Sequence, residues 1–226
     1  MIRLVSYTKP TEEFVKEGMQ DDNLLDLVAF CARVSNPSNQ MNSETSEKLV
    51  KYLIKHAHWS PLEMVNVCME IVTTRDIAHQ IVRHRSFAFQ EFSQRYANPK
   101  DQGEQFVTRE ARLQDPKNRQ NSIDVDDFEL QMNWEGYQQS VIKAAQQAYN
   151  WAIDNGIAKE QARAVLPEGL TKTTLYMNGS LRSWIHYIEL RGANGTQKEH
   201  MEIAWECAKV IADIFPLAKD LNAANS

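Results

Sequence analysis

The stretch VNVCMEIVTTRDIAHQIVRHRSFAFQEFSQRY, residues 65–96, predicts a strand, a helix and a second strand in close succession. Residues 65–73 alternate in polarity and contain several β-branched side chains, which is typical of a strand. Thr74 can cap the helix expected over residues 75–84, with an apolar face of Ile77, Ala78, Ile81 and Val82. Residues 86–92 return to an extended pattern that puts Phe87 and Phe89 on one face. The chain is therefore expected to be of mixed α and β class.

Outward from this stretch, the sequence predicts mainly helices joined by loops. Strands are expected over residues 2–7 and 171–177, with a candidate strand over 104–108. Helices are expected over residues 22–33 with Asp22 as cap, and over 43–57, 60–63, 126–155, 159–166, 181–190 and 197–215. Residues 98–122 are expected to be loops and residues 217–226 a frayed tail. With no internal repeat and no linker, residues 1–226 are expected to form a single domain.

Two expectations concern the helical core. The longest helix, which begins at Asp126 or Asp127, has a seam formed by Tyr137, Val141, Ala144, Ala148 and Ala152. Trp151, Trp184 and Trp205 are expected to lie in the core.

Composition excludes several classes of protein. The net charge of −5 argues against general affinity for nucleic acid, which needs a basic face. Cys31, Cys68 and Cys207 form no CxxC pair, so neither a zinc site nor a disulfide framework is predicted, and a reducing cytoplasm is expected. No apolar run is long enough for a membrane span, so no membrane is expected. With no glycine-rich phosphate loop, a phosphate would be held by side chains and helix N-termini.

One segment reverses the acidic character of the chain. Residues 83–95 contain Arg83, His84, Arg85 and Arg95 and a single acid, Glu91. Guanidinium groups held close together repel unless an anion lies between them, so this cluster predicts a site for a phosphate-bearing ligand. Gln80 and Arg83 lie three apart on the expected helix and can face one ligand. Ser93 has no nucleophile elbow and no evident base, which favours a hydrogen-bond donor over a nucleophile.

Other candidate residues each have a structural alternative. Glu91 can neutralise Arg85 or Arg95, or accept a hydrogen bond from a ligand, and the sequence favours neither. His56 and His58 lack a third ligand at a known spacing, so no metal is predicted. Among the remaining candidates, Arg163 can lie on a helix surface, Arg182 and His186 lie four apart on one helix face, and Arg191 can cap the last carbonyls of its helix. These residues predict a nucleotide or phosphate site but not a reaction.

Arg83-His84-Arg85, followed after seven residues by Ser93-Gln94-Arg95, resembles the RHR-x7-S-x-R signature of the flavin-dependent thymidylate synthases. The resemblance extends along most of the chain. Four further segments are similar to family motifs: Ala32–Ser35 to ARVS, Lys55–Glu63 to KHGHxTPxEH, Ala162–Pro167 to ARxVLP, and Ser180–Arg191 with Gln197 to the closing block.

The resemblance implies an α+β fold, with a central antiparallel or mixed sheet flanked by helices. It implies an enzyme, a methyltransferase of thymidylate biosynthesis that converts dUMP to dTMP. The carbon would come from 5,10-methylenetetrahydrofolate and the hydride from reduced FAD, which NADPH regenerates. It also implies a homotetramer with shared active sites and small-molecule partners only.

Residue roles carry over by position. The resemblance assigns dUMP contacts to Gln80, Arg83, Glu91, Ser93, Gln94, Arg95, Arg163 and Arg191. It assigns cofactor contacts to Ser35, His58, Ser60, Arg83, His84, Arg85, Glu91, Ser180, Leu181, Arg182 and His186. Arg191 matches the catalytic arginine that stabilises the uracil N3 anion, and His58 matches a histidine of the flavin and folate pocket. The chain departs from the common pattern at Gln90, His186 and Gly195, where many members have Asn, Asn and His.

Two other hypotheses use the same residues. A non-catalytic nucleotide- or RNA-binding protein would need a basic stripe and stacking aromatics on an exposed sheet. A metal hydrolase would need His56, His58, His79 and His84 to come together.

Overall fold

The computed structural model describes residues 1–19 and 23–219 and has an α+β fold built on a four-stranded sheet. The strands are β1 (Ile2–Tyr7), β2 (Asn66–Thr74), β3 (Ala88–Glu91) and β6 (Lys172–Ser180). They pair in the order β1-β2-β6-β3, and every pairing is antiparallel. The predicted central sheet is confirmed, and it is antiparallel rather than mixed.

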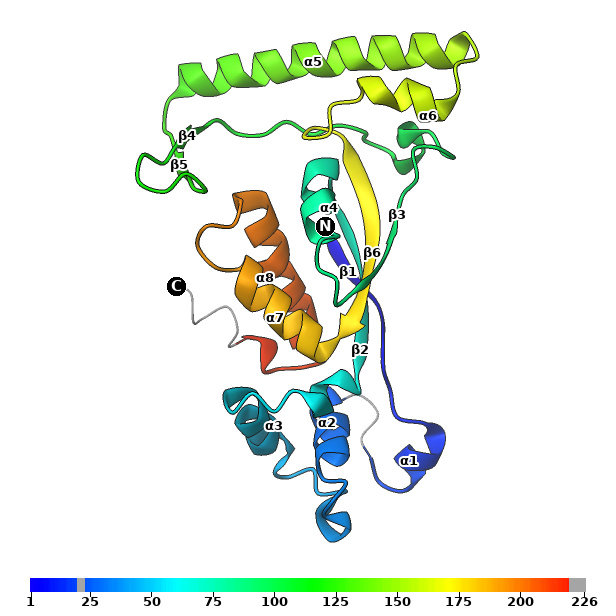
Figure 1. Cartoon of the computed structure of the whole chain (residues 1–226), viewed down its shortest axis with the longest axis vertical. Coiled ribbons are helices and arrows are strands. Elements are labelled where there is room, and N and C mark those ends of the chain that lie inside the picture. The colour runs from blue at the N-terminus through cyan, green and yellow to red at the C-terminus, as the bar shows by residue number, and fades with distance from the viewer. Residues whose placement is uncertain (20–22, 220–226) are drawn as a thin grey trace.

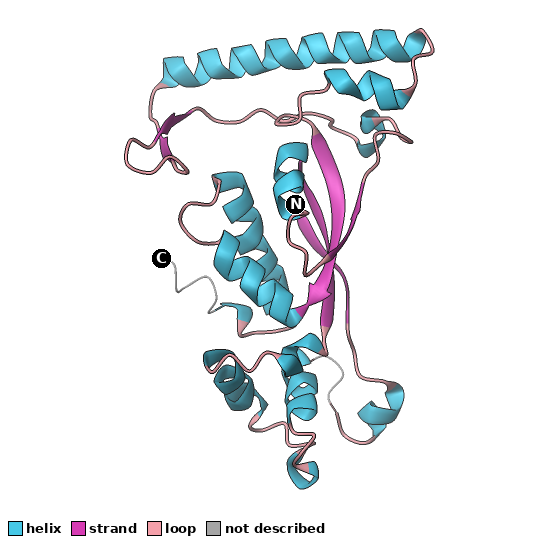
Figure 2. Cartoon of the chain, viewed as in Figure 1, coloured by secondary structure: helices cyan, strands magenta, loops and turns pink. Residues whose placement is uncertain are grey.

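Helices pack around the sheet in groups (Figures 1 and 2). They are α1 (Glu12–Lys16), α2 (Leu24–Ala32), α3 (Ser46–Lys55), α4 (Arg75–Ile81), α5 (Phe128–Asp154), α6 (Lys159–Ala162), α7 (Leu181–Arg191) and α8 (Lys198–Ala212). Short 3₁₀ helices are η1 (Pro37–Asn39), η2 (Ser60–Glu63), η3 (Pro99–Gln102) and η4 (Arg163–Val165). Figure 1 shows α7 and α8 beside the sheet, α2 and α3 at one end of the molecule, and α5 with α6 across the other end.

The main core lies between the sheet and α7 and α8. Val67, Met69 and Ile71 of β2 and Leu175 and Met177 of β6 are fully buried there. The indole N–H of Trp184 on α7 donates to the carbonyl oxygen of Val67 at 3.0 Å, which ties the helix to the sheet. Burying a tryptophan is stabilising when its N–H finds such an acceptor. A smaller core joins α5 to α6 and to Phe106, through Ile142, Tyr149, Ala152, Ala162 and Leu166.

The strand–helix–strand prediction for residues 65–96 is confirmed, although α4 ends at Ile81 rather than at residue 84. Residues 60–63 form a 3₁₀ helix, and residues 104–108 form only an isolated bridge from Phe106 to Thr171. The region expected to be loop contains a hairpin of β4 (Arg112–Gln114) and β5 (Ser122–Asp124). Asn23, not the predicted Asp22, caps α2, and Asp22 lies outside the described residues.

Three expectations about burial were wrong. Most of the seam proposed for α5 faces outward: Tyr137 is 72% exposed, while Gln138, Ile142, Ala145 and Tyr149 are buried, and of the seam residues Ala152 is buried as predicted. Trp151 is 63% exposed, whereas Trp184 is fully buried as predicted. Leu217 and Ala218 are buried in the main core instead of fraying, and residues 220–226 lie outside the described chain. In the described part of the chain, no helix combines the length and apolarity needed to span a membrane.

Candidate active site

The predicted site residues fall into three groups, which different elements hold in place. The first group surrounds Arg191, at the end of α7. The second lies between β3, α4 and η4. The third lies around η2 and the start of α7.

In the first group, the Arg191 side chain bonds to a histidine instead of an acid. Nε of Arg191 donates to Nε2 of His84 at 2.9 Å, across 107 residues of sequence. The His84 ring also packs edge-on against Tyr187 at 5.0 Å and lies 6.4 Å from the ring of His200. Among the described residues, no carboxylate forms an ion pair with Arg191, so its positive charge is not neutralised.

Burial keeps this group free of further charge. Burial and the charge of Arg191 lower the pKa of His84 to about 4, and burial, Arg191 and His84 lower the pKa of His200 to about 3. Burial raises the pKa of Tyr187 well above its usual value, so its hydroxyl stays protonated. A neutral His84 has a lone pair on Nε2, which is what allows it to accept from Arg191. The terminal nitrogens of the guanidinium therefore remain available to a ligand.

Gln80 belongs to the same group, because its amide contacts both Gln197 and His200. A hollow of about 590 Å³ opens beside Gln197, between the β4–β5 hairpin and α8. This volume lies within the range of about 300–1,000 Å³ that is usual for small-molecule sites.

The second group surrounds a cavity of about 370 Å³ lined by Arg75, Gln94, Glu160, Arg163, Ala164, Leu166 and Glu168. Gln94 is only 3% exposed, and its amide nitrogen has no partner in the described structure. A buried donor without a partner is costly, and a bound ligand can satisfy it. Arg95 approaches Glu160 at 3.7 Å, with both side chains about half exposed, so that contact is weak.

Glu91 contacts neither of the arginines that the sequence offered as partners. Its Oε1 accepts from Arg75 at 3.2 Å and from the hydroxyl of Thr173 at 2.9 Å. The Arg75 and Glu91 side chains are mostly buried, at 14% and 21% exposure, so this pair fixes β3 against α4. Arg83 and Arg85 are exposed and form no ion pair with any described carboxylate.

The third group contains most of the residues predicted for the cofactor. The rings of Trp59 and His186 are 4.4 Å apart, and Tyr52 lies 6.0 Å from exposed His58. Arg182 forms an ion pair with Glu63 of η2. Ser180 caps α7 by accepting from the backbone of Ser183, and Ser60 begins η2. Ser35 is exposed after α2. Leu181 is fully buried and donates its N–H to Val65, which gives it a structural contact instead of an exposed one.

The structure disagrees with the two other hypotheses. Phe87 and Phe89 pack against the main core, so they form no exposed stacking platform. The four histidines proposed for a hydrolase are dispersed: His84 binds Arg191, and His79 pairs with Glu168. In the described part of the chain, no group of three or more His, Cys, Asp or Glu residues could hold a metal ion.

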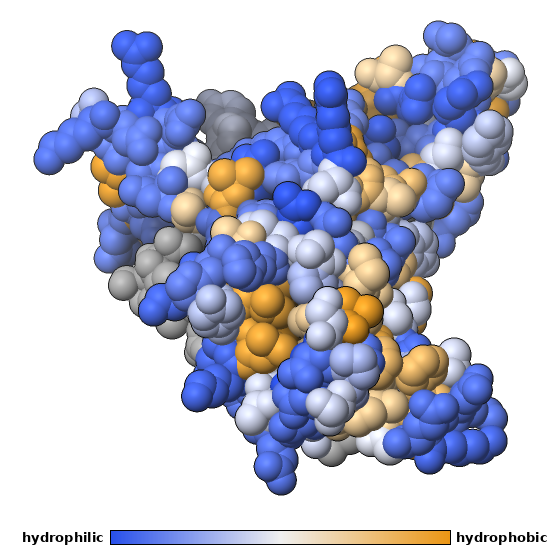
Figure 3. All heavy atoms as spheres, turned by 60° about the horizontal axis from the view of Figure 1, so that its bottom comes forward, coloured by the Kyte–Doolittle hydropathy of each residue, from blue (hydrophilic) through white to orange (hydrophobic). Residues whose placement is uncertain are grey.

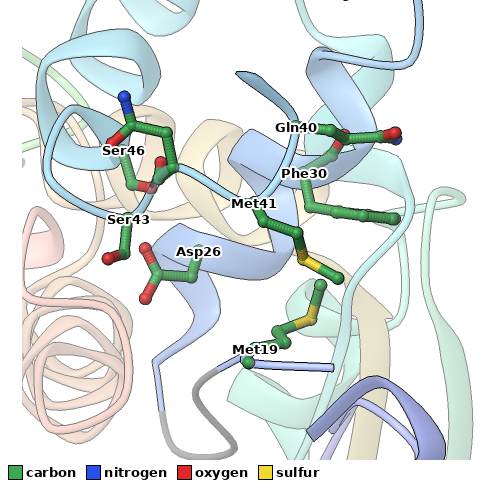
Figure 4. A pocket seen from close by; sticks show the side chains of 9 residues that line it. Met19, Asp26, Phe30, Gln40, Met41, Ser43 and Ser46 are labelled. Atoms are coloured by element: carbon green, nitrogen blue, oxygen red, sulfur yellow. Dashed lines mark hydrogen bonds between the residues drawn. The ribbon is translucent and has the colours of Figure 1, made fainter. Parts of the chain in front are cut away.

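A separate small cavity lies between α2 and the segment leading to α3 (Figure 4). The side chains of Met19, Phe30 and Met41 gather on one side and those of Asp26, Ser43 and Ser46 on the other. Its volume of about 10 Å³ suits a single water molecule and cannot take a nucleotide.

Three residues of the site were not predicted: Tyr187, His200 and Arg75. His200 lies on the buried stripe of α8, one turn before Ala204, and it is fully buried. A histidine in register with an apolar stripe is a signal that the sequence contained. Nothing in the sequence indicated that Arg75 would pair with Glu91.

Comparison with known proteins supplies the class. The family model described as "Thymidylate synthase complementing protein" matches residues 19–217. The chain is 46% identical to the "probable flavin-dependent thymidylate synthase" of Paramecium bursaria Chlorella virus 1, over 97% of this chain and 98% of that protein. It is 45% identical to the flavin-dependent thymidylate synthase of Synechocystis sp., over 95% of each. The chain therefore belongs to the family of flavin-dependent thymidylate synthases, which are FAD-dependent methyltransferases.

The fold has a close counterpart among solved structures. A UMP/dUMP methylase from Streptomyces cacaoi, bound with 5-Br dUMP, superimposes with a TM-score of 0.79. It is 22% identical and covers 100% of this chain and 95% of that chain. This similarity shows that the α+β fold is shared.

Proposed function

We propose that this protein converts dUMP to dTMP, taking the carbon from 5,10-methylenetetrahydrofolate and the hydride from reduced FAD, which NADPH regenerates. Family membership supports the reaction class. The observation that carries the proposal is the unneutralised Arg191 guanidinium, held by a neutral His84 at 2.9 Å.

Arg191 has the chemistry that the reaction requires. Carbon C5 of uracil is a poor nucleophile, and ionisation of the pyrimidine at N3 raises its electron density. A guanidinium beside N3 and O4 stabilises that anion in proportion to its uncompensated charge. A carboxylate partner would cancel part of the charge, whereas neutral His84 orients Arg191 without doing so. FAD, once reduced, supplies the hydride that completes the methyl group.

In this proposal, the second group of residues holds the phosphate and sugar of dUMP. Arg163 and Gln94 line the cavity of about 370 Å³, with Arg95 at its edge through Glu160. Ser93 offers a hydroxyl donor and Glu91 an acceptor for a sugar hydroxyl. The unpartnered amide nitrogen of buried Gln94 supports an acceptor-rich ligand such as phosphate.

The residues proposed for the cofactor, which come from all three groups, have a donor set that fits FAD. Arg83 and Arg85 are exposed cations without a described carboxylate partner, which suits a diphosphate. Ser35, Ser60 and Ser180 add hydroxyl groups, and the Trp59–His186 pair adds an aromatic surface for a ring. His58, His84, Arg182, His186 and Glu91 complete the proposed cofactor contacts, and Leu181 would support them through the start of α7.

We further propose a homotetramer whose active sites are shared between subunits. Helix α5 exposes large hydrophobic residues that a lone chain has no reason to leave uncovered: Phe128, Leu130, Met132, Trp134, Tyr137, Val141 and Trp151. Figure 3 shows hydrophobic atoms on the face that it turns toward the viewer. Val34, Tyr52 and Met64, which belong to the segments at the end opposite α5, are also exposed. Association would bring the Arg191 group of one subunit to the arginine cavity of another.

A mixing experiment tests the shared site. Arg191→Ala and Arg163→Ala proteins should each be nearly inactive, and subunit exchange between them should restore activity in mixed tetramers. If exchange is verified by mass spectrometry and activity does not return, the two arginines serve the same subunit's site. A monomer in light scattering would contradict the assembly itself.

The reaction is tested by the flavin spectrum. The purified protein should be yellow, and reduced FAD should reoxidise only when dUMP and methylenetetrahydrofolate are both present. Colourless protein that also fails to bind added FAD would refute the proposal. Activity should persist in excess EDTA, since no metal is invoked. The cytoplasm is the proposed location, and the three free cysteines agree with a reducing compartment.

A further inference from the structure

A line of hydrogen bonds runs from the β4–β5 hairpin to the interior of α7 and passes through the predicted dUMP residue Gln80. Arg112 donates to Oε1 of Glu199, and Oε2 of Glu199 accepts from Gln197 at 2.9 Å. Oε1 of Gln197 accepts from Nε2 of Gln80 at 2.8 Å. Oε1 of Gln80 lies 3.3 Å from Nδ1 of His200, whose Nε2 lies 3.1 Å from the hydroxyl of Tyr187. We call this series the Glu199–Tyr187 relay.

The Glu199 carboxylate dictates the direction of every bond in the relay. Because an ionised carboxylate only accepts, Gln197 must turn its amide nitrogen toward Glu199. Its oxygen then faces Gln80, so Gln80 must present its own nitrogen there. The oxygen of Gln80 in turn faces His200 and needs a donor. His200 must therefore carry its proton on Nδ1 and accept on Nε2 from Tyr187.

The surroundings of His200 agree with this assignment. His200 is fully buried, and a positive charge on it would lie near Arg191. A neutral ring with one donor and one acceptor nitrogen satisfies both of its neighbours. Tyr187 is 1% exposed and keeps its hydroxyl proton, so it can donate to Nε2.

The relay determines what Gln80 can offer to a ligand. The oxygen of Gln80 is committed to His200 and one amide hydrogen to Gln197, which leaves the second amide hydrogen. We propose that His200 is a positioning residue that holds the Gln80 amide as a hydrogen-bond donor toward an acceptor oxygen of the nucleotide. This inference rests on the proposed function for the identity of the nucleotide. Without His200, the amide could turn over and present its oxygen, which would repel the same ligand atom.

Two substitutions at one position test the proposal in the FAD-loaded protein. His200→Leu removes the donor, whereas His200→Asn keeps an amide N–H close to the position of Nδ1. Calorimetry should show about tenfold weaker dUMP binding for His200→Leu, equivalent to about 1.4 kcal/mol. His200→Asn should bind within about threefold of wild type, since it restores the neutral hydrogen bond to Gln80. The turnover number at saturating dUMP should change by less than about threefold in both, because Arg191 is untouched.

The matched control is Ile211→Ala, at another buried position of α8 that has no part in the relay. It should lower the melting temperature and leave dUMP affinity unchanged. The proposal is overturned if His200→Leu binds dUMP as wild type does, or if His200→Asn binds as weakly as His200→Leu. Should His200→Leu not fold, Glu199→Gln serves as a second variant. This variant replaces the carboxylate, which can only accept, with an amide. It should weaken dUMP binding about threefold, because a charged hydrogen-bond partner becomes a neutral one. Unchanged affinity would overturn the proposal.

The tautomer of His200 gives a readout that needs no ligand. Proton–nitrogen NMR of the imidazoles, with His200 assigned by comparison with His200→Asn, should show the proton on Nδ1. A proton on Nε2 would overturn the relay. If the relay is correct but wild-type protein binds no dUMP, the proposed function fails and takes the nucleotide role of Gln80 with it. These two failures are therefore distinguishable.

Discussion

The buried histidine His200 makes the free energy of unfolding of this protein depend on pH. Its pKa is lowered to about 3 in the folded chain, chiefly by burial and further by the charge of Arg191 and the proximity of His84. In the unfolded chain it returns to about 6.5. Below pH 6.5 the unfolded chain therefore binds a proton that the folded chain does not. Protonation then favours unfolding, so the stability that this group provides is full above pH 6.5 and is lost as the pH falls toward 3.

The size of the effect follows from the same two values. At pH 5 the solution is 1.5 pH units below the unfolded pKa, and each unit corresponds to about 1.36 kcal/mol. Between pH 7.5 and pH 5, His200 alone should therefore lower the free energy of unfolding by about 2 kcal/mol. Solvent does not screen this loss, because the His200 side chain has no exposure to solvent. His84, whose pKa is lowered to about 4, should add a loss of the same sign, which is smaller because its side chain is only partly buried and solvent screens it.

Urea unfolding of wild type and His200→Asn at several pH values isolates the contribution of His200. Protein concentration and flavin content are kept equal, because bound ligand and assembly both shift apparent stability. The contribution of His84 remains in both proteins and largely cancels in the difference. Wild type should lose about 2 kcal/mol more than His200→Asn between pH 7.5 and pH 5. A flat difference, or a variant that loses more than wild type, would refute the neutral buried histidine.

Other predictions test the arginines and the packing. Arg191→Ala should lower turnover by about 10²–10³, the usual loss when a donor to a developing anion is removed, while dUMP affinity changes less; near-normal turnover would exclude the activation role. Arg95→Ala should raise the dUMP dissociation constant roughly 10- to 100-fold, as for a hydrogen bond to a charged group, and an unchanged constant would remove it from the site. Gly179→Ala should cost about 1–3 kcal/mol, because the new Cβ would lie 2.4 Å from Cδ1 of Phe87. Gly136→Ala in the interior of α5 is the control, since no atom lies within 4 Å, and it should gain about 1 kcal/mol or less.

Local patterns predicted the elements well where one periodicity dominated. The alternation of residues 65–73 correctly predicted strand β2. Asp127 and Asn155 cap the two ends of the longest helix, as predicted. The α5 seam failed at Tyr137, Val141, Ala144 and Ala148, which are exposed, because the helix is hydrophobic on two faces. One face packs on α6 through Tyr149 and Ala152, and the other, with Tyr137 and Trp151, is exposed. Periodicity reveals an apolar face without saying which neighbour covers it.

The hairpin β4–β5 was missed for a different reason. Its strands are three residues each, bounded by Asp115 and Asn121, in a region rich in turn residues. Segments this short carry too little alternation to predict, and long-range contacts hold this one in place. Arg112 of β4 contacts Glu199 of α8, and Asn121 bonds to Asn194 after α7. Only the folded structure shows that these residues, distant in sequence, are in contact.

The predicted site residues could not be sorted by role from the sequence, because the role of an arginine depends on its partner in the fold. Three partly buried arginines pair with acids across the fold: Arg75 with Glu91, Arg109 with Asp76, and Arg112 with Glu199. Acids within the protein neutralise these three arginines, so replacing any of them should lower the stability of the fold. Arg83, Arg85 and Arg191 have no carboxylate partner among the described residues, and Arg191 has neutral His84 instead.

This difference gives the arginines opposite thermodynamic signatures. An arginine whose charge is uncompensated in the free protein destabilises it, and the binding of an anion relieves that cost. Replacing Arg191 with Ala should therefore leave stability at pH 7 unchanged or higher, and it should raise the pKa of both His84 and His200 by removing a nearby positive charge. Replacing Arg112 should instead strand Glu199 and lower stability. Arg112 is therefore expected to act on stability through Glu199, whereas the uncancelled charge of Arg191 is what its proposed role beside the uracil anion requires.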